Sequence, residues 1–228
     1  MFFKELSKAT FQLFFPNQCG ACSRDLEIKE EYLCLHCKQE MNFISSDAHA
    51  QKLLESVFKG RIELVNIWSL FEYKEDGNTR HIPHKIKYNG HKNLGIHMGR
   101  MLGESLTNDH NIDLIIPLPL HYKKERLRGF NQSDLIAQGV AEKIGKPIHL
   151  NIIKRIKYNQ SQTKFSKYDR WDNVREIFDL ERPELIENKH VLLIDDVLTT
   201  GATLESAAQE ISKAKNTRIS IATLAARL

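Results

Sequence analysis

The chain has 228 residues, of which 41% are hydrophobic and 27% charged, with a formal net charge of +4 at pH 7. This size fits one ordinary domain with a small appendage, and the composition excludes a low-complexity or disordered protein. The longest apolar runs, Val191–Ile194 and Ile219–Leu224, have the length of strands. A membrane-spanning helix needs about 18 apolar residues, so we expect no membrane span.

The N-terminal segment is apolar but interrupted by charges. Five phenylalanines between residues 2 and 15 are separated by Lys4, Glu5 and Lys8. A secretory signal needs an unbroken apolar core, which this pattern lacks. We expect an amphipathic helix packed on the body of the protein, with a membrane anchor as the alternative, and a cytoplasmic location.

All four cysteines lie within 19 residues, as Cys19, Cys22, Cys34 and Cys37. In each CxxC pair one tight turn can direct two thiolates at one ion, and two pairs complete a tetrahedron. The pattern predicts a structural zinc ribbon in an N-terminal domain of residues 1–45, which also holds the leading helix. The alternatives are two disulfides, which require an oxidising compartment, and a redox-active CxxC.

The second predicted domain, residues 46–228, alternates strand and helix signals. We expect a turn at 72–78, strands at 64–71, 112–116, 147–153, 191–194 and 219–225, and helices at 79–88, 91–106, 133–144 and 203–214. Fully apolar strands between helices indicate an α/β fold with a parallel sheet covered on both faces. Ligands bind beyond the carboxyl ends of such strands, which places the expected site after Ile116 and after Ile194.

The strand that ends at Ile116 is followed by Pro117-Leu118-Pro119-Leu120 and then by a basic loop with Arg126 and Arg128. If this strand neighbours the one that ends at Ile194, the two arginines can clamp a pyrophosphate bidentately. Residues 121–175 hold 13 Lys and Arg against 5 Asp and Glu, a net charge of +8 that suggests phosphates or nucleic acid as ligand. A solvated basic surface is the alternative.

The strongest signal is the run Asp195-Asp196-Val197-Leu198-Thr199-Thr200-Gly201-Ala202-Thr203, which opens into a helix. The small residues after Leu198 let backbone N–H groups converge on a phosphate at a helix N-terminus, and the three threonines add hydroxyl donors. Gly201 lets the backbone approach a ligand closely. The two aspartates suit ribose hydroxyls, or a divalent metal that bridges to pyrophosphate.

Two other interpretations of this run fit less of it. An apolar strand followed by two aspartates also occurs in P-loop nucleotide-binding proteins, but the chain has no upstream G-x-x-x-x-G-K-[ST] loop. An acidic helix cap without a ligand accounts for one aspartate only.

The run resembles the phosphoribosyl pyrophosphate (PRPP) motif of type I phosphoribosyltransferases. The chain as a whole resembles the ComF family (ComFC-like and GntX-like proteins), which is associated with DNA uptake during natural transformation. The resemblance covers nearly all 228 residues. Besides the PRPP run, it rests on Phe-Pro-x-x-Cys-x-x-Cys from Phe15, Lys87-Tyr88-x-Gly90, Pro117-Leu118-Pro119 and Arg126-x-Arg128-Gly129-Phe130-Asn131-Gln132.

The resemblance implies a type I phosphoribosyltransferase-like fold that binds PRPP with Mg²⁺. The motifs are less specific for a reaction; our hypothesis, if the protein is an enzyme, is phosphoribosyl transfer by displacement at the anomeric carbon, with Asp195, Asp196, Arg126 and Arg128 as catalytic residues. The implied PRPP ligands are Asp195, Asp196, Thr199, Thr200, Gly201, Ala202, Thr203 and Lys87. For Lys87 a solvated charge at a helix end is an equal alternative, and no acceptor pocket is recognisable in the sequence.

The polar stretch of residues 154–176 lacks clean periodicity. Together with Phe178 it is similar to a segment that the resemblance implies to be a flap, which closes over PRPP and excludes water. Arg170 is the flap candidate, whereas Asn159 and Phe165 depart from the family pattern and leave the flap contacts open.

A second hypothesis comes from a different class. The protein would handle single-stranded DNA, with a phosphoribosyl pocket that is regulatory or vestigial, and Tyr122, Phe130, Tyr158 or Trp171 would stack on bases. A third possibility is a structural partner of a helicase-like DNA-uptake protein.

Overall fold

The computed structural model describes residues 17–44, 47–88, 91–106, 111–157 and 177–228. In these ranges one sheet has the strand order β1-β6-β5-β2, and all its pairs are parallel. The strands are β1 (Ile67–Glu72), β6 (Arg218–Ala226), β5 (His190–Leu198) and β2 (Leu114–Pro117). A separate antiparallel pair is formed by β3 (Ile153–Arg155) and β4 (Phe178–Leu180).

Helices cover both faces of the sheet. One face packs against α4 (His81–Tyr88), α5 (Lys92–Ser105) and α7 (Gln132–Ile144), and the other against α3 (Ala48–Ser56) and α9 (Ala202–Ile211). Side chains alternate between the faces along β5, where Leu192 and Ile194 join the first core and Val191 and Leu193 the second. The expected α/β architecture with a doubly covered parallel sheet is confirmed.

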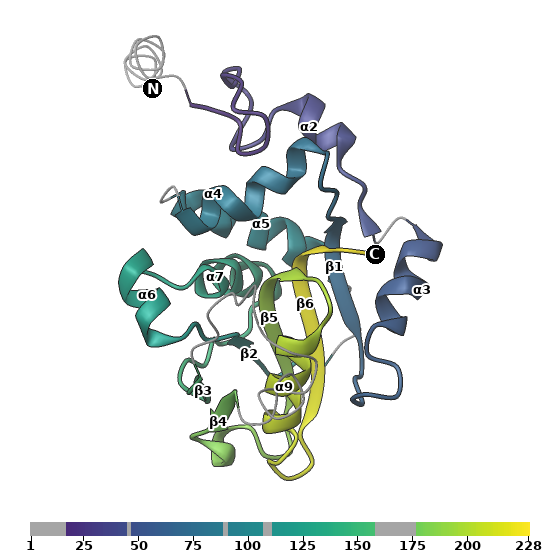
Figure 1. Cartoon of the computed structure of the whole chain (residues 1–228), viewed down its shortest axis with the longest axis vertical. Coiled ribbons are helices and arrows are strands. Elements are labelled where there is room, and N and C mark those ends of the chain that lie inside the picture. The colour runs from purple at the N-terminus through teal and green to yellow at the C-terminus, as the bar shows by residue number, and fades with distance from the viewer. Residues whose placement is uncertain (1–16, 45–46, 89–90, 107–110, 158–176) are drawn as a thin grey trace, which may run out of the picture.

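The cysteine-rich segment lies at one end of this body. It leads into α2 (Leu35–Glu40) and sits beside α4 and α5, whereas β3 and β4 lie at the opposite end (Figure 1). Cys19, Cys34 and Cys37 share one buried cluster with Leu94 and Met98 of α5. None of the described helices is long and apolar enough to cross a membrane. The expected N-terminal helix and most of the expected flap, including Tyr158, Arg170 and Trp171, fall outside the described residues.

Several element bounds differ from expectation: the strand expected at 64–71 is Ile67–Glu72, and the helix expected at 203–214 is Ala202–Ile211. Three further differences bear on the site. The expected strand at 147–153 is divided, because Ile148 forms a bridge with Ile115 of β2 whereas β3 begins only at Ile153. The expected basic loop is the helix α6 (Tyr122–Arg128), which starts at the capping His121 and ends at Gly129 in the left-handed region. Strand β5 continues to Leu198, so Asp195 and Asp196 lie within it.

The extension of β5 has a clear cause. Residues 195 to 198 continue the parallel ladder with β6, where Asp195 pairs with Thr223 and Leu198 with Ala226. The two carboxylates are therefore held by sheet hydrogen bonds on a rigid strand rather than on the loop that follows it.

Helices α5 and α7 pack closely because glycines face each other across them. A Cβ on Gly139 would overlap the carbonyl oxygen of Ile96 and lie 2.6 Å from the backbone nitrogen of Arg100. A Cβ on Gly99 would overlap the carbonyl oxygen of Ile136. Since α7 carries Ser133 at its N-terminal end, this contact fixes a helix that borders the carboxylates.

We predict that Gly139→Ala lowers the free energy of unfolding by about 1–3 kcal/mol, because the backbones must separate to admit the methyl group. Urea unfolding followed by circular dichroism measures the loss. The matched control is Gly77→Ala, whose added Cβ would find its nearest neighbour at 3.6 Å and should change little. Equal stability of the two variants would contradict the close packing of α5 on α7.

Candidate functional site

The carboxyl ends of β2 and β5 lie side by side, which is the condition for the residues after both strands to form one site. Pro117 is in register with Ile194, and the backbone N–H of Leu118 donates to the carbonyl of Ile194 at 2.8 Å. The residues after both strands therefore meet at one edge of the sheet, which confirms that the two strands are neighbours.

Two adjoining hollows open at this edge. The first, here called the basic hollow, is lined by Lys87, Leu118, Pro119, Leu120, Lys124, Arg128, Gln132, Arg155, Asp195, Asp196 and Thr203. The second, the loop hollow, is lined by Asp195 and by every residue from Val197 to Leu204. Asp195 and Thr203 belong to both hollows and so mark the boundary between them.

The loop hollow is built by the turn from β5 into α9. Gly201 caps α9 with φ = 76°, a left-handed conformation that favours glycine. The N–H of Ala202 donates to Thr200 Oγ1 at 3.4 Å, and the first-turn amides of α9 have no helical carbonyl partner. Helix N-termini of this kind bind anions through these amides and through the helix dipole.

Gly201 has a second role that the sequence did not reveal. A Cβ at this position would lie 2.8 Å from the ring carbon Cε1 of Phe58, so the missing side chain also makes room for Phe58. Arg61 holds the loop from the same side, because its Nη1 donates to the carbonyl of Thr200 at 3.0 Å and its Nη2 pairs with Glu205. Contacts with Phe58 and Arg61 therefore fix the conformation of the loop.

The two aspartates have different partners. Asp196 is buried, and its Oδ2 lies 2.5 Å from Nζ of Lys87. Burial lowers the pKa of Lys87, but the charge and hydrogen bond of Asp196 together with the charge of Asp195 outweigh it, and the net pKa is raised. Lys87, which the sequence placed either at the ligand or in solvent, therefore lies in the basic hollow in contact with a carboxylate.

Asp195 accepts a hydrogen bond from Ser133 Oγ at 3.0 Å. Burial and then the neighbouring Asp196 raise the pKa of Asp195 to about 7, although Lys87 and Ser133 favour the charged form. At neutral pH this carboxyl group is close to half protonated, so a ligand can change its ionisation.

The segment from Arg128 to Ser133 organises the basic hollow. Arg128 donates to Gln132 Oε1 at 2.8 Å and to the Tyr88 hydroxyl at 3.3 Å. Asn131 caps α7 by accepting from the N–H of Ser133, and its side-chain amide donates to the carbonyl of Leu118 at 3.0 Å. One short motif thus fixes an arginine, the loop after β2 and the start of α7.

The structure separates the two arginines that the sequence grouped together. Arg128 lines the basic hollow, whereas Arg126 is exposed and does not line it. Three residues that the sequence did not single out do belong to the site, namely Ser133, Lys124 and Arg155. Of these, only Ser133 was adjacent to a recognised motif.

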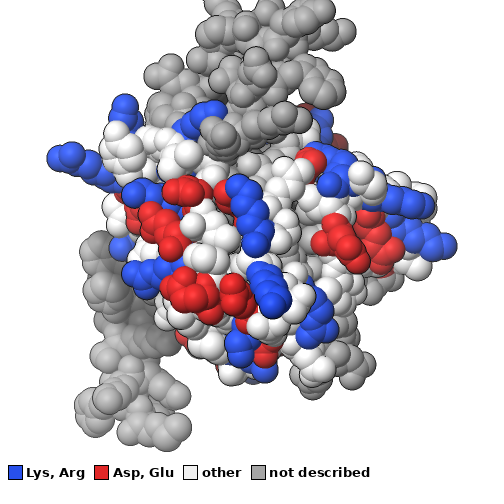
Figure 2. All heavy atoms as spheres, turned by 90° about the horizontal axis from the view of Figure 1, so that it is seen from below, with Lys and Arg blue, Asp and Glu red and all other residues white. Residues whose placement is uncertain are grey.

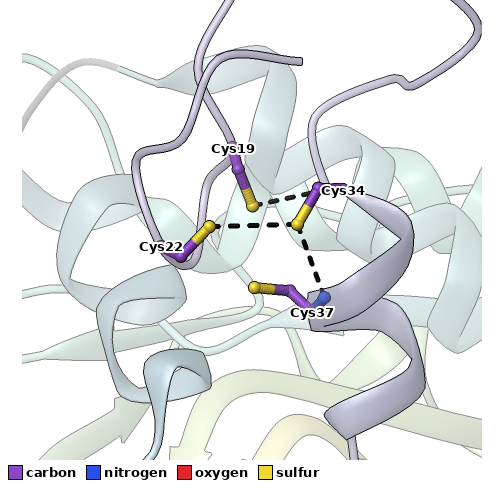
Figure 3. A group of neighbouring side chains, drawn as sticks. All are labelled: Cys19, Cys22, Cys34 and Cys37. Atoms are coloured by element: carbon purple, nitrogen blue, oxygen red, sulfur yellow. Dashed lines mark hydrogen bonds between the residues drawn. The ribbon is translucent and has the colours of Figure 1, made fainter. Parts of the chain in front are cut away.

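The four cysteines form a compact group on the side of α4 opposite the carboxylates. Their sulfur atoms all lie within 4.8 Å of one another, and those of Cys22 and Cys34 are 3.8 Å apart (Figure 3). A zinc–sulfur length of about 2.3 Å gives a tetrahedral edge of about 3.8 Å, whereas a disulfide measures about 2.05 Å. All four thiols are free, so the group fits a tetrahedral metal ion and not two disulfides.

Backbone amides support thiolates in this group. Cys19 Sγ accepts from the N–H groups of Ala21 and Cys34, each at 3.4 Å, and Cys34 Sγ accepts from the N–H of Cys37 at 3.4 Å. Burial raises the pKa of the Cys19 thiol, but the backbone amides of Cys34, Cys22 and Ala21 outweigh it and the pKa is lowered to about 7, whereas burial raises the pKa of Cys22 and Cys37. The donor set therefore suits a closed structural metal site.

Helix α4 connects the cysteine group to the carboxylates. Lys85 donates from Nζ to the carbonyl of Cys19 and to Ser23 Oγ, both at 2.8 Å, and Lys87 contacts Asp196 two residues later. Two residues correspond to about 200° around a helix, so the two lysines point to opposite sides. The same short helix thus contacts both the cysteine group and the candidate site.

Comparison with known proteins identifies the relatives of this chain. The Phosphoribosyl transferase domain family matches residues 132–228. Competence protein F of Haemophilus influenzae is 26% identical over 214 residues, which cover 88% of this chain and 93% of that protein. The DNA utilization protein YhgH of Salmonella typhimurium is 30% identical over 132 residues, which cover 55% of this chain and 57% of that protein. Competence protein ComFC of Bacillus subtilis is 37% identical over 112 residues, which cover 49% of this chain and 43% of that protein.

Solved structures with a similar chain path are more distant. A glutamine phosphoribosylpyrophosphate amidotransferase from B. subtilis is 19% identical with a TM-score of 0.43, covering 61% of this chain and 30% of that chain. A hypoxanthine phosphoribosyltransferase from Staphylococcus aureus is 20% identical with a TM-score of 0.38, covering 59% of this chain and 64% of that chain. Neither likeness is close enough to bear on the reaction.

We predict that Lys85→Met speeds the release of bound metal to a chromogenic chelator by about tenfold or more. The reason is that hydrogen bonds to a charged donor contribute about 1.5–3 kcal/mol and these two hold the first CxxC turn. Metal content before chelation should stay at the wild-type value, since the four thiols are intact. Lys52→Met, an exposed lysine on α3, is the matched control. Wild-type release kinetics in Lys85→Met would show that α4 does not hold the ribbon.

Proposed function

We propose that the chain is a ComF-type protein with a phosphoribosyltransferase-like domain and that it binds PRPP across the two hollows. The 5′-phosphate would occupy the loop hollow, the diphosphate would occupy the basic hollow, and the ribose would lie over Asp195 and Asp196. The ion of the cysteine group would be zinc, with a structural role.

One observation carries this proposal. Two hollows suited to anions meet at Asp195 and Thr203, so acceptors for hydroxyl groups lie between two regions that attract phosphate. This sequence of anion, hydroxyl-binding and anion subsites matches the charge pattern of a ribose that carries a 5′-phosphate and a 1′-diphosphate. A simple helix cap would not require the second hollow.

The electrostatics of the basic hollow support a multiply charged ligand. Burial and the nearby Arg155 and Arg128 lower the pKa of Lys124, which is the effect of cations crowded together. A diphosphate would relieve this repulsion through charge-assisted hydrogen bonds. Mg²⁺ bound to the diphosphate would neutralise further charge on the leaving group.

The chemistry that this arrangement suits is displacement at the anomeric carbon. The bond between that carbon and the diphosphate oxygen breaks, and the electron pair leaves with the oxygen. The acceptor forms a bond to the carbon, and the acceptor loses a proton. Arg128 and Lys124 would stabilise charge on the departing oxygen, and Asp195 and Asp196 would hold the ribose hydroxyls in position. Catalysis would be mostly positioning and electrostatics.

The names of the relatives indicate the process in which such a site acts. Competence protein F, ComFC and YhgH are named for competence or DNA utilization. We extend to this chain a role in DNA uptake, exercised in the cytoplasm, where thiols stay reduced and PRPP is available.

Direct handling of single-stranded DNA is the second candidate. Tyr122 is 64% exposed beside Lys123, and Tyr88 is 61% exposed beneath the guanidinium of Arg128, so cations and exposed rings alternate at the rim of the basic hollow. On the face drawn in Figure 2, however, the described basic and acidic side chains lie side by side rather than in a basic stripe. This face therefore offers no extended basic surface for DNA, and the contact proposed here is at the rim of the basic hollow.

We predict that calorimetry with PRPP and Mg²⁺ shows one site per chain and that Asp196→Asn weakens it by about 10- to 100-fold, because a buried charged hydrogen-bond acceptor is lost. Asp179→Asn, on the exposed side of β4, is the matched control and should bind like wild type. Thermal melting checks that both variants fold. Absence of heat with wild-type protein, or equal affinity in both variants, contradicts PRPP binding at this site.

Gel shifts with labelled single-stranded DNA distinguish the second candidate function, which predicts DNA binding that Asp196→Asn leaves intact.

A pH dependence follows from the pKa of Asp195. The pKa is raised to about 7, and the carboxylate is the form that accepts hydrogen bonds from ribose hydroxyls, so affinity should rise with pH through 7 and level off above it. We predict that PRPP binds wild-type protein about tenfold more weakly at pH 6 than at pH 8, after correction for the pH dependence of Asp195→Asn. The variant supplies this correction because the ligand phosphates titrate equally in both measurements. Ser133→Ala should move the midpoint to higher pH. Identical pH profiles for wild type and Asp195→Asn would contradict this role.

A further inference from the structure

We propose that Arg155 is a direct ligand of the diphosphate, the role that the sequence indicated for Arg126. This inference rests on the proposed binding of PRPP. It adds a residue from the β3–β4 hairpin to a site otherwise built at the carboxyl edge of the main sheet.

The position of Arg155 is the first support. Arg155 is the last residue of β3 and lines the basic hollow together with Lys87, Lys124 and Arg128, but it does not line the loop hollow. The site therefore brings its side chain to the diphosphate subsite and not to that of the 5′-phosphate.

The side chain is held in place without using its hydrogen bonds. Arg155 is in register with Phe178 on β4, and its guanidinium carbon lies 5.6 Å from the centroid of that ring. Such stacking orients an arginine while its N–H groups remain available to an anion.

The Nε atom of Arg155 is buried and has no hydrogen-bond partner among the described residues. Burial lowers the pKa of Arg155, which the charge of Asp195 partly offsets. An unsatisfied buried donor on a cation is costly, so the group is suited to a ligand oxygen. Arg128, in contrast, already donates to Gln132 and Tyr88.

Arg126 does not meet these conditions. It lies two residues before Arg128 on α6, about 200° away around the helix, and is exposed. Among the described residues, Arg128 and Arg155, which approach the hollow from α6 and β3, are therefore the pair of arginines placed to clamp a diphosphate.

The test compares three ligands in calorimetry with Mg²⁺ present: PRPP, inorganic pyrophosphate and ribose 5-phosphate. We expect Arg155→Gln to weaken PRPP and pyrophosphate by about 10- to 100-fold and to leave ribose 5-phosphate within about twofold. Arg155→Lys should lie between, because it keeps the charge and loses the planar fork. Arg126→Gln and Lys154→Gln, both exposed, are the controls and should match wild type.

Each other outcome overturns the inference in a recognisable way. Unchanged pyrophosphate affinity in Arg155→Gln, with wild type binding normally, removes Arg155 alone and leaves PRPP binding standing. Equal losses for all three ligands, with a lowered melting temperature in both Arg155 variants, show a role in folding only. If wild-type protein binds none of the three ligands, the proposed function fails and this inference fails with it.

Discussion

The ion pair between Lys87 and Asp196 is the interaction on which the rest of the site depends. It joins the last turn of α4 to the central strand β5 through atoms 2.5 Å apart, and removing one partner of such a buried pair costs about 3–5 kcal/mol. Because Lys85 of the same helix holds the first CxxC turn, an eight-residue helix links the cysteine group to the carboxylates. The cysteine group therefore contributes to the geometry of the site, although its members do not line either hollow.

Neighbouring carboxylates on one strand have distinct chemical states because their partners differ. Asp196 is paired with a lysine, whereas Asp195 faces the Ser133 hydroxyl and has a pKa of about 7. A ligand whose anionic groups pair with the cations of the basic hollow, and whose hydroxyls donate hydrogen bonds to Asp195, would satisfy the cations and the carboxylate together. A phosphorylated ribose has these properties, and its binding would be coupled to the release of a proton.

The fold class and the location of the site could be predicted from the sequence because both depend on local patterns. Val191–Ile194 is apolar at every position, and the small residues after Leu198 are contiguous in the chain. The contacts that complete the site are not local: Ser133 reaches Asp195 over 62 residues, and Arg155 depends on the pairing of β3 with β4. The choice between Arg126 and Arg128 depends on the orientation of α6, a helix that the sequence pattern did not predict.

Hydrogen–deuterium exchange tests the central claim most directly, namely that the turn from β5 into α9 binds a phosphate of PRPP while α4 holds the opposite wall. With PRPP and Mg²⁺ added, the account predicts slower exchange of the amides from Thr199 to Leu204 and of those in α4, whereas α3 stays unchanged. Exchange that is unaltered in the turn, or slowed only in elements away from both hollows, would contradict it.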